Sequence, residues 1–163
     1  MKIYKEKVLA DAHKEGRELA KKAIAEFCGS ESFNIYYNEN GKPLCDKCFF
    51  NISHKRDMVV CAVSDKNIGI DIEYITDIKE RNDYLLMSSE EAEFINAIKD
   101  KQNERFFTIF TMKEAFVKML GGKLKDAAKL NTVKNGEIKT DFEEFIFNTE
   151  IIGETIITTC EEK

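Results

Sequence analysis

Two carboxylates stand two residues apart in residues 68–73, which read Ile-Gly-Ile-Asp-Ile-Glu. In a β-strand successive side chains point to opposite faces, so the isoleucines would share one face, and Asp71 and Glu73 the other. The carboxylates would then lie roughly 6.5–7 Å apart and repel each other unless a cation lies between them. Gly69, on the same face, would leave room for a ligand. The pattern fits a site for a hard cation such as Mg²⁺, and it also fits a half-exposed strand with a solvated acidic face.

A polar stripe crosses the phenylalanine-rich residues 103–120, which must form a largely buried helix. At helical period Thr111, Glu114 and Lys118 share one narrow stripe, and Glu114 and Lys118 could form an ordinary helix salt bridge. Burying both charges in such an apolar helix is costly unless a partner neutralises them. A metal ion beside Glu114 and a phosphate beside Lys118 would supply that partner. Lys113 lies off the stripe, and the pattern gives it no role.

Other side chains could meet phosphate groups by their type and position. Ser53 and His54 end a predicted strand just before a turn, where their polar atoms can be presented at its tip. Lys42 comes just before the turn-forming Pro43, and the first predicted helix carries further cationic side chains, Lys14 and Arg17. Each of these residues, taken alone, is also typical of a solvated surface.

The five cysteines are irregularly spaced and odd in number, a pattern that does not indicate a disulfide framework. Cys45 and Cys48 form a Cys-x-x-Cys pair that could be redox active, or could bind Zn²⁺ together with His54 and Cys61. No second cysteine pair follows at a usual zinc spacing. Reduced, unpaired thiols are therefore the prediction.

Periodicity and glycine stops indicate the elements that position these residues. Helices are predicted at 8–27 with a break near Gly16, at 88–99 with Ser88 as its cap, and at 103–120, ending at Gly121. Strands are predicted at 33–37, 49–53, 58–64, 68–73, 145–152 and 154–160. A helix, a glycine stop, a short strand and an Asn-Gly turn occur at 17–41 and again at 103–136. This echo is either chance or the trace of an α+β fold with two similar halves.

The composition limits the classes of function. The chain has 163 residues, the size of one domain, and 43% of them are hydrophobic, which excludes disorder as the main state. A net charge of −5, with no long lysine tract, gives no support for binding nucleic acid or an anionic membrane. No window approaches the ~20 apolar residues of a membrane helix, and the N-terminus lacks the apolar core of a signal peptide. We therefore expect a cytoplasmic protein with no nucleic-acid or membrane partner.

Four segments resemble, in order, the motifs of the 4′-phosphopantetheinyl transferases of the Sfp type. They are residues 41–43 (Gly-Lys-Pro), 50–54 (Phe-Asn-Ile-Ser-His), 69–73 (Gly-x-Asp-x-Glu) and 110–118 (Phe-x-x-Lys-Glu-Ala-x-x-Lys). Phe110 stands where many members carry Trp. The resemblance covers about residues 41–122, and the last two predicted strands also fit the end of the family. It implies one α+β domain, 1–163, in which antiparallel strands pack with helices. The approximate halves 1–66 and 67–163 would be related by pseudo-twofold symmetry.

The resemblance also implies an activity. Such enzymes transfer the 4′-phosphopantetheine arm of coenzyme A (CoA) to a serine of an apo acyl or peptidyl carrier protein, with Mg²⁺, and release adenosine 3′,5′-bisphosphate. By motif position, Asp71, Glu73 and Glu114 would hold Mg²⁺. Asp71, Glu114 and Lys118 would be catalytic, with Glu114 as the candidate base. The residues implied to contact CoA are Lys14 or Arg17, Lys42, Pro43, Ser53, His54 and Lys118.

Other interpretations remain open at this point. The segment before residue 41 is shorter than in typical members, which places the grip on the 3′-phosphate at Lys14 or, alternatively, Arg17. A degenerate member would bind CoA or a carrier protein without transfer, and a small zinc-stabilised binding module would use Cys45 and Cys48. A metal-dependent nuclease is disfavoured, because Glu114 and Lys118 belong to a helix and no basic face is present. We expect a monomer, since two halves would supply internally the interface that shorter relatives make between subunits.

Overall fold

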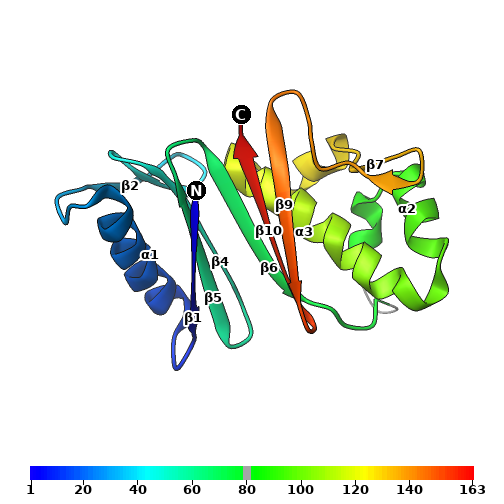
Figure 1. The fold of residues 1–163 in the computed structure, drawn as a ribbon, viewed down its shortest axis with the longest axis horizontal. Helices are drawn as coiled ribbons and strands as arrows, with labels where there is room; N and C mark the ends of the chain where they lie inside the picture. Colours follow the sequence, from blue (N-terminus) through cyan, green and yellow to red (C-terminus); the bar gives the residue numbers. More distant parts are fainter. Residues whose placement is uncertain (79–81) are drawn as a thin grey trace.

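Two three-stranded antiparallel sheets lie side by side, and each carries one long helix (Figure 1). The structure is a computed structural model that describes residues 1–78 and 82–163. The first sheet has the order β1 (Lys2–Lys7), β5 (Met58–Ser64), β4 (Phe49–Lys55), and the second has the order β6 (Ile68–Tyr74), β10 (Thr155–Glu162), β9 (Phe145–Ile152). Helix α1 (Ala12–Cys28) packs on β4 and β5, and α3 (Gln102–Leu120) packs on β6 and β10. The predicted α+β class is confirmed.

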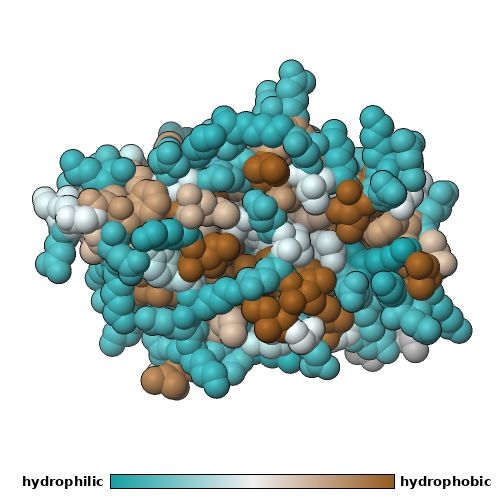
Figure 2. Space-filling view, in the orientation of Figure 1, coloured by the Kyte–Doolittle hydropathy of each residue, from teal (hydrophilic) through white to brown (hydrophobic). Residues whose placement is uncertain are grey.

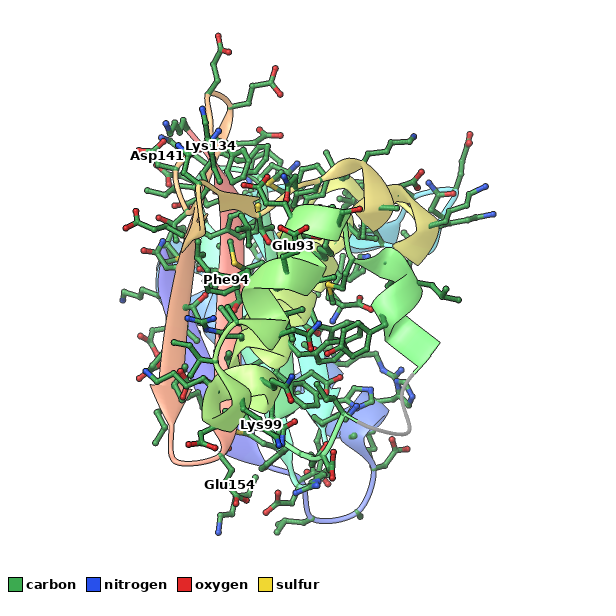
Figure 3. All side chains as sticks on the ribbon, turned by 90° about the vertical axis from the view of Figure 1, so that its right-hand side faces the viewer. Glu93, Phe94, Lys99, Lys134, Asp141 and Glu154 are labelled. Atoms are coloured by element: carbon green, nitrogen blue, oxygen red, sulfur yellow. The ribbon has the colours of Figure 1, made fainter. Side chains whose placement is uncertain are left out.

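Smaller elements complete each half. Hairpins form from β2 (Ile35–Tyr37) with β3 (Pro43–Cys45), and from β7 (Val133–Lys134) with β8 (Glu137–Ile138). The other elements are α2 (Ser89–Asn96) and the 3₁₀ turns η1 (Asn82–Leu86), η2 (Lys99–Lys101) and η3 (Leu124–Lys129). Figure 3 looks onto the end of the molecule where α2 packs on α3, with Glu93 and Phe94 of α2 labelled. No helix in the described part of the chain has the length and hydropathy of a membrane span.

The order of elements repeats along the chain. Each half runs strand, long helix, small hairpin, long hairpin, and in each sheet the first strand pairs with the last, as in β1-β5-β4 and β6-β10-β9. The glycines follow the same repeat: Gly29 and Gly121 cap the long helices in the left-handed conformation, and Gly41 and Gly136 have positive φ in the turns of the small hairpins. The echo in the sequence thus corresponds to a repeated topology. A pseudo-twofold relation between halves 1–66 and 67–163 stays a prediction.

The two sheets meet along a seam between β4 and β6 that is joined by side chains. The backbone N–H of Ile70 donates to the side-chain oxygen of Asn51 on β4 at 3.1 Å. Further along the seam, Ser53 of β4 donates to Asp71 of β6 at 2.9 Å, and Lys55 donates to Glu73 at 2.8 Å. The seam therefore brings two candidate motifs, residues 50–54 and 69–73, into direct contact.

Helix α1 differs from its prediction at its start and at Gly16. It begins at Ala12, because Asp11 caps it and the Glu15 carboxylate accepts three backbone N–H groups from residues 9–11. Further toward the N-terminus, Lys2–Lys7 form β1, a strand that was not predicted from the sequence. The helix is continuous through Gly16. A Cβ at this position would lie 3.2 Å from side-chain atoms of Ile52 and Val59. Gly16 therefore allows α1 to pack closely on the first sheet.

Gly69 has a different role from the predicted one. The isoleucines of β6 pack into a core with Val60 and Ala62, as predicted, so Gly69, Asp71 and Glu73 share the opposite face. A Cβ at Gly69 would lie 2.0 Å from the carbonyl oxygen of Ala115 and 2.5 Å from the backbone nitrogen of Met119. The expectation that Gly69 leaves space for a ligand is therefore wrong, because α3 fills that space.

We expect Gly69→Ala to destabilise the protein by about 3 kcal/mol, because the new methyl group collides with helix backbone that cannot rotate away. The midpoint of thermal unfolding should fall by roughly 6–12 °C for a chain of this size. Gly16→Ala is the matched control, since its methyl group meets only side-chain tips and the change favours a helix. Equal melting temperatures for Gly69→Ala and wild type would contradict this account.

The start of α2 is as predicted, and its end is not. Ser88 caps the helix and forms a capping box with Glu91, but the helix stops at Asn96 rather than at residue 99, because Ile98 is extended. Glu91 is fully buried and accepts hydrogen bonds from the backbone and hydroxyl of Thr132 at 2.8 and 2.9 Å. It also pairs at 3.0 Å with Lys113, which is fully buried on α3. Lys113 thus has a structural role in joining α3 to α2.

Candidate active site

The carboxylates of β6 lie against α3, with cations already beside them. Asp71 and Glu73 are only 5% and 7% exposed. The Lys118 ammonium donates to one Asp71 oxygen at 2.6 Å and to the Ser53 hydroxyl at 2.9 Å. The partner of Glu73 is Lys55, at 2.8 Å. Two buried like charges on one face are thus each held by a lysine, one from the helix and one from the neighbouring sheet.

Each carboxylate nevertheless keeps one oxygen without a partner among the described residues. Oδ2 of Asp71 and Oε2 of Glu73 are buried side-chain atoms with no hydrogen bond to residues 1–78 or 82–163. A buried carboxylate oxygen without a partner is unfavourable by itself. The two oxygens come from adjacent same-face positions of one strand. Their donor chemistry, carboxylate oxygen, suits a hard divalent cation.

The polar stripe of α3 faces this part of the sheet. Thr111 lies 2.8 Å from Thr158 of β10, hydroxyl to hydroxyl, and Thr158 is the strand partner of Asp71. Lys118, at the other end of the stripe, reaches Asp71 itself. Glu114 lies between them on the helix and is half-buried. The predicted stripe is therefore found on the side of the helix that contacts the acidic strand.

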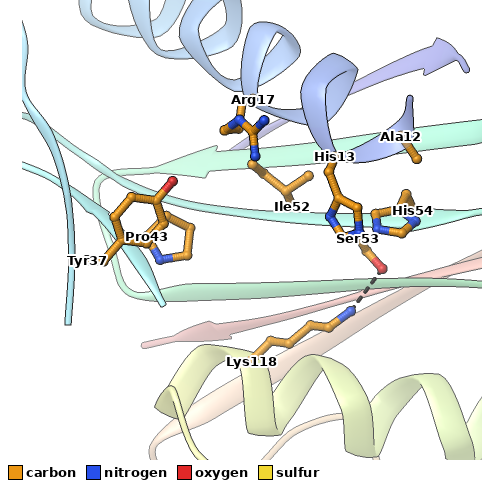
Figure 4. A pocket seen from close by; sticks show the side chains of 9 residues that line it. All are labelled: Ala12, His13, Arg17, Tyr37, Pro43, Ile52, Ser53, His54 and Lys118. Atoms are coloured by element: carbon orange, nitrogen blue, oxygen red, sulfur yellow. Dashed lines mark hydrogen bonds between the residues drawn. The ribbon is translucent and has the colours of Figure 1, made fainter. Parts of the chain in front are cut away.

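A pocket of about 380 Å³ lies beside the acidic pair, and it reaches that pair through Ser53 and Lys118 (Figure 4). One wall comes from the first turns of α1, and the other includes Tyr37 and Pro43 of the β2–β3 hairpin. The lining residues are Ala12, His13, Arg17, Tyr37, Pro43, Ile52, Ser53, His54 and Lys118. An arginine, a lysine and two imidazoles thus line one hollow of a protein whose net charge is −5.

The pocket separates the two candidates for a phosphate contact on α1. Arg17 lines it, whereas Lys14 does not and is exposed to solvent. His13, which the sequence analysis did not select, lines it and packs edge-on against His54 with 4.6 Å between ring centroids. The signal was available, because His13 and Arg17 are four residues apart and so share one helix face. Geometry therefore favours Arg17 over Lys14.

Lys42 and Pro43 are placed differently from each other. Pro43 lines the main pocket and two smaller adjoining hollows. The Lys42 ammonium is directed to the end of α3, where it donates to the carbonyl of Met119 at 2.5 Å and to Asn67 at 2.8 Å. Burial lowers the pKa of Lys42, and Glu162 opposes that effect. Lys42 thus joins the two halves, and in this structure its charge is used by the protein itself.

Partial burial lowers the pKa of His54, and the nearby His13 and Lys118 add to the shift. His54 in the folded protein therefore resists protonation more than it does in the unfolded chain. Stability from this effect is complete above the ordinary value of 6.5 and is lost as the pH falls through the pKa of the folded state. An anion in the pocket would reverse the shift, because a negative charge favours the imidazolium form.

We expect the free energy of unfolding to decrease as the pH falls below 6.5, and to decrease less in His54→Gln, which has no group to protonate there. Urea unfolding at a series of pH values measures both curves. The chain has only two histidines, so a His13→Gln variant completes the comparison. Parallel curves for wild type and His54→Gln would rule out this origin of the pH dependence.

The metal sites considered from sequence have different outcomes. Among residues 1–78 and 82–163, no three His, Cys, Asp or Glu side chains form a group that could hold a metal ion. The zinc alternative therefore has no support: Cys45 ends β3 and Cys48 immediately precedes β4, while His54 lies near the other end of β4. Among the same residues, Asp71, Glu73 and Glu114 do not form such a group either, so this set stays a prediction. Lysines hold one oxygen of each β6 carboxylate.

Comparison with known proteins agrees with this arrangement. The model of the 4′-phosphopantetheinyl transferase superfamily matches residues 67–158, which include both β6 carboxylates and the whole of α3. The chain belongs to that superfamily, and the predicted family is confirmed.

Individual relatives are of the Sfp type. The chain is 33% identical over 117 residues to the 4′-phosphopantetheinyl transferase gsp of Aneurinibacillus migulanus, covering 65% of this chain and 46% of that protein. It is 38% identical over 86 residues to psf-1 of Bacillus pumilus, covering 50% and 37%. With Sfp of Bacillus subtilis strain 168 it shares 29% identity over 142 residues, covering 80% and 63%. The chain thus spans about half the length of the curated relatives it matches.

Proposed function

We propose that this protein transfers the 4′-phosphopantetheine arm of CoA to a serine of an apo acyl or peptidyl carrier protein. The observation that carries the proposal is the contact at the seam, where Lys118 bridges Asp71 and Ser53 at the inner end of a cationic pocket. The names of the relatives give the same activity for those proteins. We further propose that the protein acts in the cytoplasm as a monomer, with no nucleic-acid or membrane partner.

The pocket suits the phosphates of CoA by charge. Arg17 offers a planar fork of N–H donors for a phosphate, and His13 and His54 can donate beside it. Lys118 stands at the inner end, where the pyrophosphate would meet the acidic strand. Tyr37, Pro43 and Ile52 offer the apolar surface against which a base could lie. Lys14 and Lys42 are less suitable phosphate ligands. Lys14 lies outside the pocket, and Lys42 donates to the backbone of α3.

The donor set on β6 fits Mg²⁺. The unpartnered buried oxygens of Asp71 and Glu73 would hold it, and Glu114 is the third candidate ligand. When bound, a divalent cation there would neutralise charge on the pyrophosphate. Lys118 and Lys55 fix the positions of the two carboxylates, because Lys118 donates to Oδ1 of Asp71 and Lys55 donates to Oε1 of Glu73.

The reaction needs a serine hydroxyl to attack phosphorus while its proton is removed. The serine oxygen forms a new bond to the β-phosphorus of CoA, and the bond from that phosphorus to the bridging oxygen breaks. Adenosine 3′,5′-bisphosphate leaves with the bond electrons. Lys118 offsets negative charge on the phosphates, and a carboxylate on the neighbouring turn, Glu114, is the candidate acceptor of the proton.

We expect Glu114→Gln to bind CoA with near wild-type affinity and to lose most of its turnover, because an amide cannot accept the serine proton. Calorimetry measures the binding, and the rate of carrier modification measures the turnover. Retention of most turnover would remove Glu114 both as the base and as a required Mg²⁺ ligand, and would leave the roles of Asp71, Glu73 and Lys118 in place.

Intact-mass spectrometry of an apo carrier protein tests the function directly. The carrier is incubated with this protein, CoA and Mg²⁺, and a parallel sample contains EDTA. We expect the carrier to gain the mass of one phosphopantetheine arm, and the gain to disappear with EDTA. A serine-to-alanine carrier is the control for the site of attachment.

A negative result with several carriers would be informative if CoA still bound with micromolar affinity. It would indicate a degenerate member that binds CoA or a carrier without transfer, and it would overturn the proposed activity. Transfer that persists in EDTA would overturn only the Mg²⁺ assignment. The two parts of the proposal can therefore fail separately.

A further inference from the structure

Three of the five cysteines meet at one end of the first half. Cys28 is the last residue of α1, Cys45 is the last residue of β3, and Cys48 immediately precedes β4. All three pack in the same hydrophobic cluster, Cys48 within it and Cys28 and Cys45 against it. We call these residues the thiol cluster. They lie outside the pocket and the acidic strand, so the proposed transfer leaves the thiol cluster unused.

The three thiols differ in their access to solvent. Cys48 is 7% exposed, whereas Cys28 and Cys45 are half-buried and can be reached from outside. Burial raises the pKa of the Cys48 thiol, and the neighbouring Cys45 and Cys28 add to the shift. The Cys45 sulfur accepts the backbone N–H of Lys47 at 3.5 Å, and its thiol donates to the Asp46 carboxylate at 3.8 Å. An oxidant would therefore meet Cys45 before it meets Cys48.

The remaining two cysteines are placed where an oxidant cannot reach them. Cys61 and Cys160 are fully buried, on β5 and β10. Burial raises the pKa of Cys61 to about 12 and also raises that of Cys160. Both thiols are protonated at neutral pH and provide an internal reference for selective reaction at the thiol cluster.

We propose that the thiol cluster is a reversible oxidation site at which a peroxide joins Cys45 to Cys48 in a disulfide. The Cys45 thiolate attacks one peroxide oxygen, the O–O bond breaks, and a sulfenic acid forms with release of water or the corresponding alcohol. The Cys48 sulfur then attacks the Cys45 sulfur, and the S–O bond breaks with release of water. Two thiols lose two electrons and two protons, and with hydrogen peroxide the products are one disulfide and two waters. Cys28 is the alternative attacking thiol when Cys48 is absent.

Oxidation at this position would act on one wall of the pocket. Cys45 shares the three-residue strand β3 with Pro43, which lines the pocket, and Cys48 leads directly into β4, which carries Ser53 and His54. A bond between the two sulfurs would fix β3 against the start of β4. Formation of the bond is independent of whether the protein transfers phosphopantetheine.

A tryptic map of the protein treated with equimolar hydrogen peroxide tests the proposal. Trypsin cleaves after lysine but not before proline, so Cys28 and Cys45 fall in one peptide, 23–47, and Cys48 falls in another, 48–55. After blocking of free thiols with iodoacetamide, we expect the two peptides to be joined, with two of the five thiols lost. Dithiothreitol should separate them again. A bond between Cys28 and Cys45 would instead leave both peptides separate, with a closed loop inside 23–47.

Three variants sharpen the result. In Cys45→Ser the two peptides should be joined much more slowly, because the thiol proposed to react first with the peroxide is missing. Cys28→Ser should react like wild type. Cys160→Ala is the matched control and should also react like wild type, and circular dichroism checks that each variant is folded. Joined peptides in Cys45→Ser at the wild-type rate would overturn the choice of pair. Oxidation of Cys61 or Cys160 at the same rate, or overoxidation of Cys45 with no disulfide, would overturn the site itself.

Discussion

Asp71→Asn is expected to lower the rate of phosphopantetheine transfer by about a hundredfold or more, the scale of losing a charged group aimed at the reacting centre. The amide oxygen can still accept hydrogen bonds from Ser53 and Lys118, so the seam should keep its shape. The buried carboxylate oxygen that has no partner disappears in this variant, and with it the charge that suits a cation. Kinetics of carrier modification at several Mg²⁺ concentrations measure the loss.

The control for this experiment is Glu150→Gln. Glu150 is an exposed carboxylate on β9 that pairs with Lys5 on the surface, and such pairs contribute little. It should transfer at the wild-type rate and melt at the wild-type temperature. Asp71→Asn with wild-type turnover at low Mg²⁺ would show that β6 holds no catalytic cation. An unfolded Asp71→Asn would instead indicate a structural role for the carboxylate. CoA binding measured by calorimetry would show whether the variant still has a folded pocket.

Lys113→Met is expected to destabilise the protein by about 3–5 kcal/mol, the usual effect of removing one partner of a buried ion pair. Glu91 would remain fully buried with its negative charge, and the carbonyls of Ala127 and Leu130 would lose their donor. Burial lowers the pKa of Lys113, and the neighbouring Glu91 carboxylate opposes that shift. The charge on Lys113 therefore depends on Glu91. Chemical unfolding measures the difference in free energy.

Two further variants separate the charge from the shape in this prediction. Glu91→Gln added to Lys113→Met removes the uncompensated charge and should recover only part of the stability. The amide oxygen can still accept from Thr132, but the amide NH2 cannot accept from the backbone N–H of Ser88. Lys129→Met makes the same substitution at an exposed ion pair and should change stability by less than about 0.5 kcal/mol. A single variant Lys113→Met as stable as Lys129→Met would refute the structural role assigned to this lysine.

Features that depend on local period could be read from the sequence. The alternation of isoleucine with Asp71 and Glu73 correctly predicted a strand with one apolar and one acidic face, since the strand period requires nothing beyond adjacent residues. The stripe through Glu114 and Lys118 was predicted for the same reason on a helix. Strand β1 was missed because its lysines suggest no strand, and only its pairing with β5 makes it one.

Features that depend on distant partners could not be read in this way. Gly69 looked like space for a ligand, and only the packing of α3 on β6 decides that a helix fills it. Lys113 had no role until Glu91 was placed beside it by a different helix. Lys55 beside Glu73 and His13 beside His54 are likewise contacts between separate elements. Local patterns therefore selected the candidate site residues, and tertiary packing determined which cations lie beside them.

Figure 2 shows a largely hydrophilic face, with hydrophobic side chains visible near its middle, and beneath it lies the seam between the two sheets. Each sheet closes its own backbone hydrogen bonds within one half, and each of the three hydrogen bonds described between β4 and β6 uses at least one side chain. Fusing two copies of an ancestral half-length gene would therefore require no strand to change its pairing. Only the side chains facing across the seam would have to diverge, with Asp71 and Glu73 kept on one copy and Ser53 and Lys55 on the other. Descent from a paired ancestor would explain why the proposed chemistry sits where the copies meet.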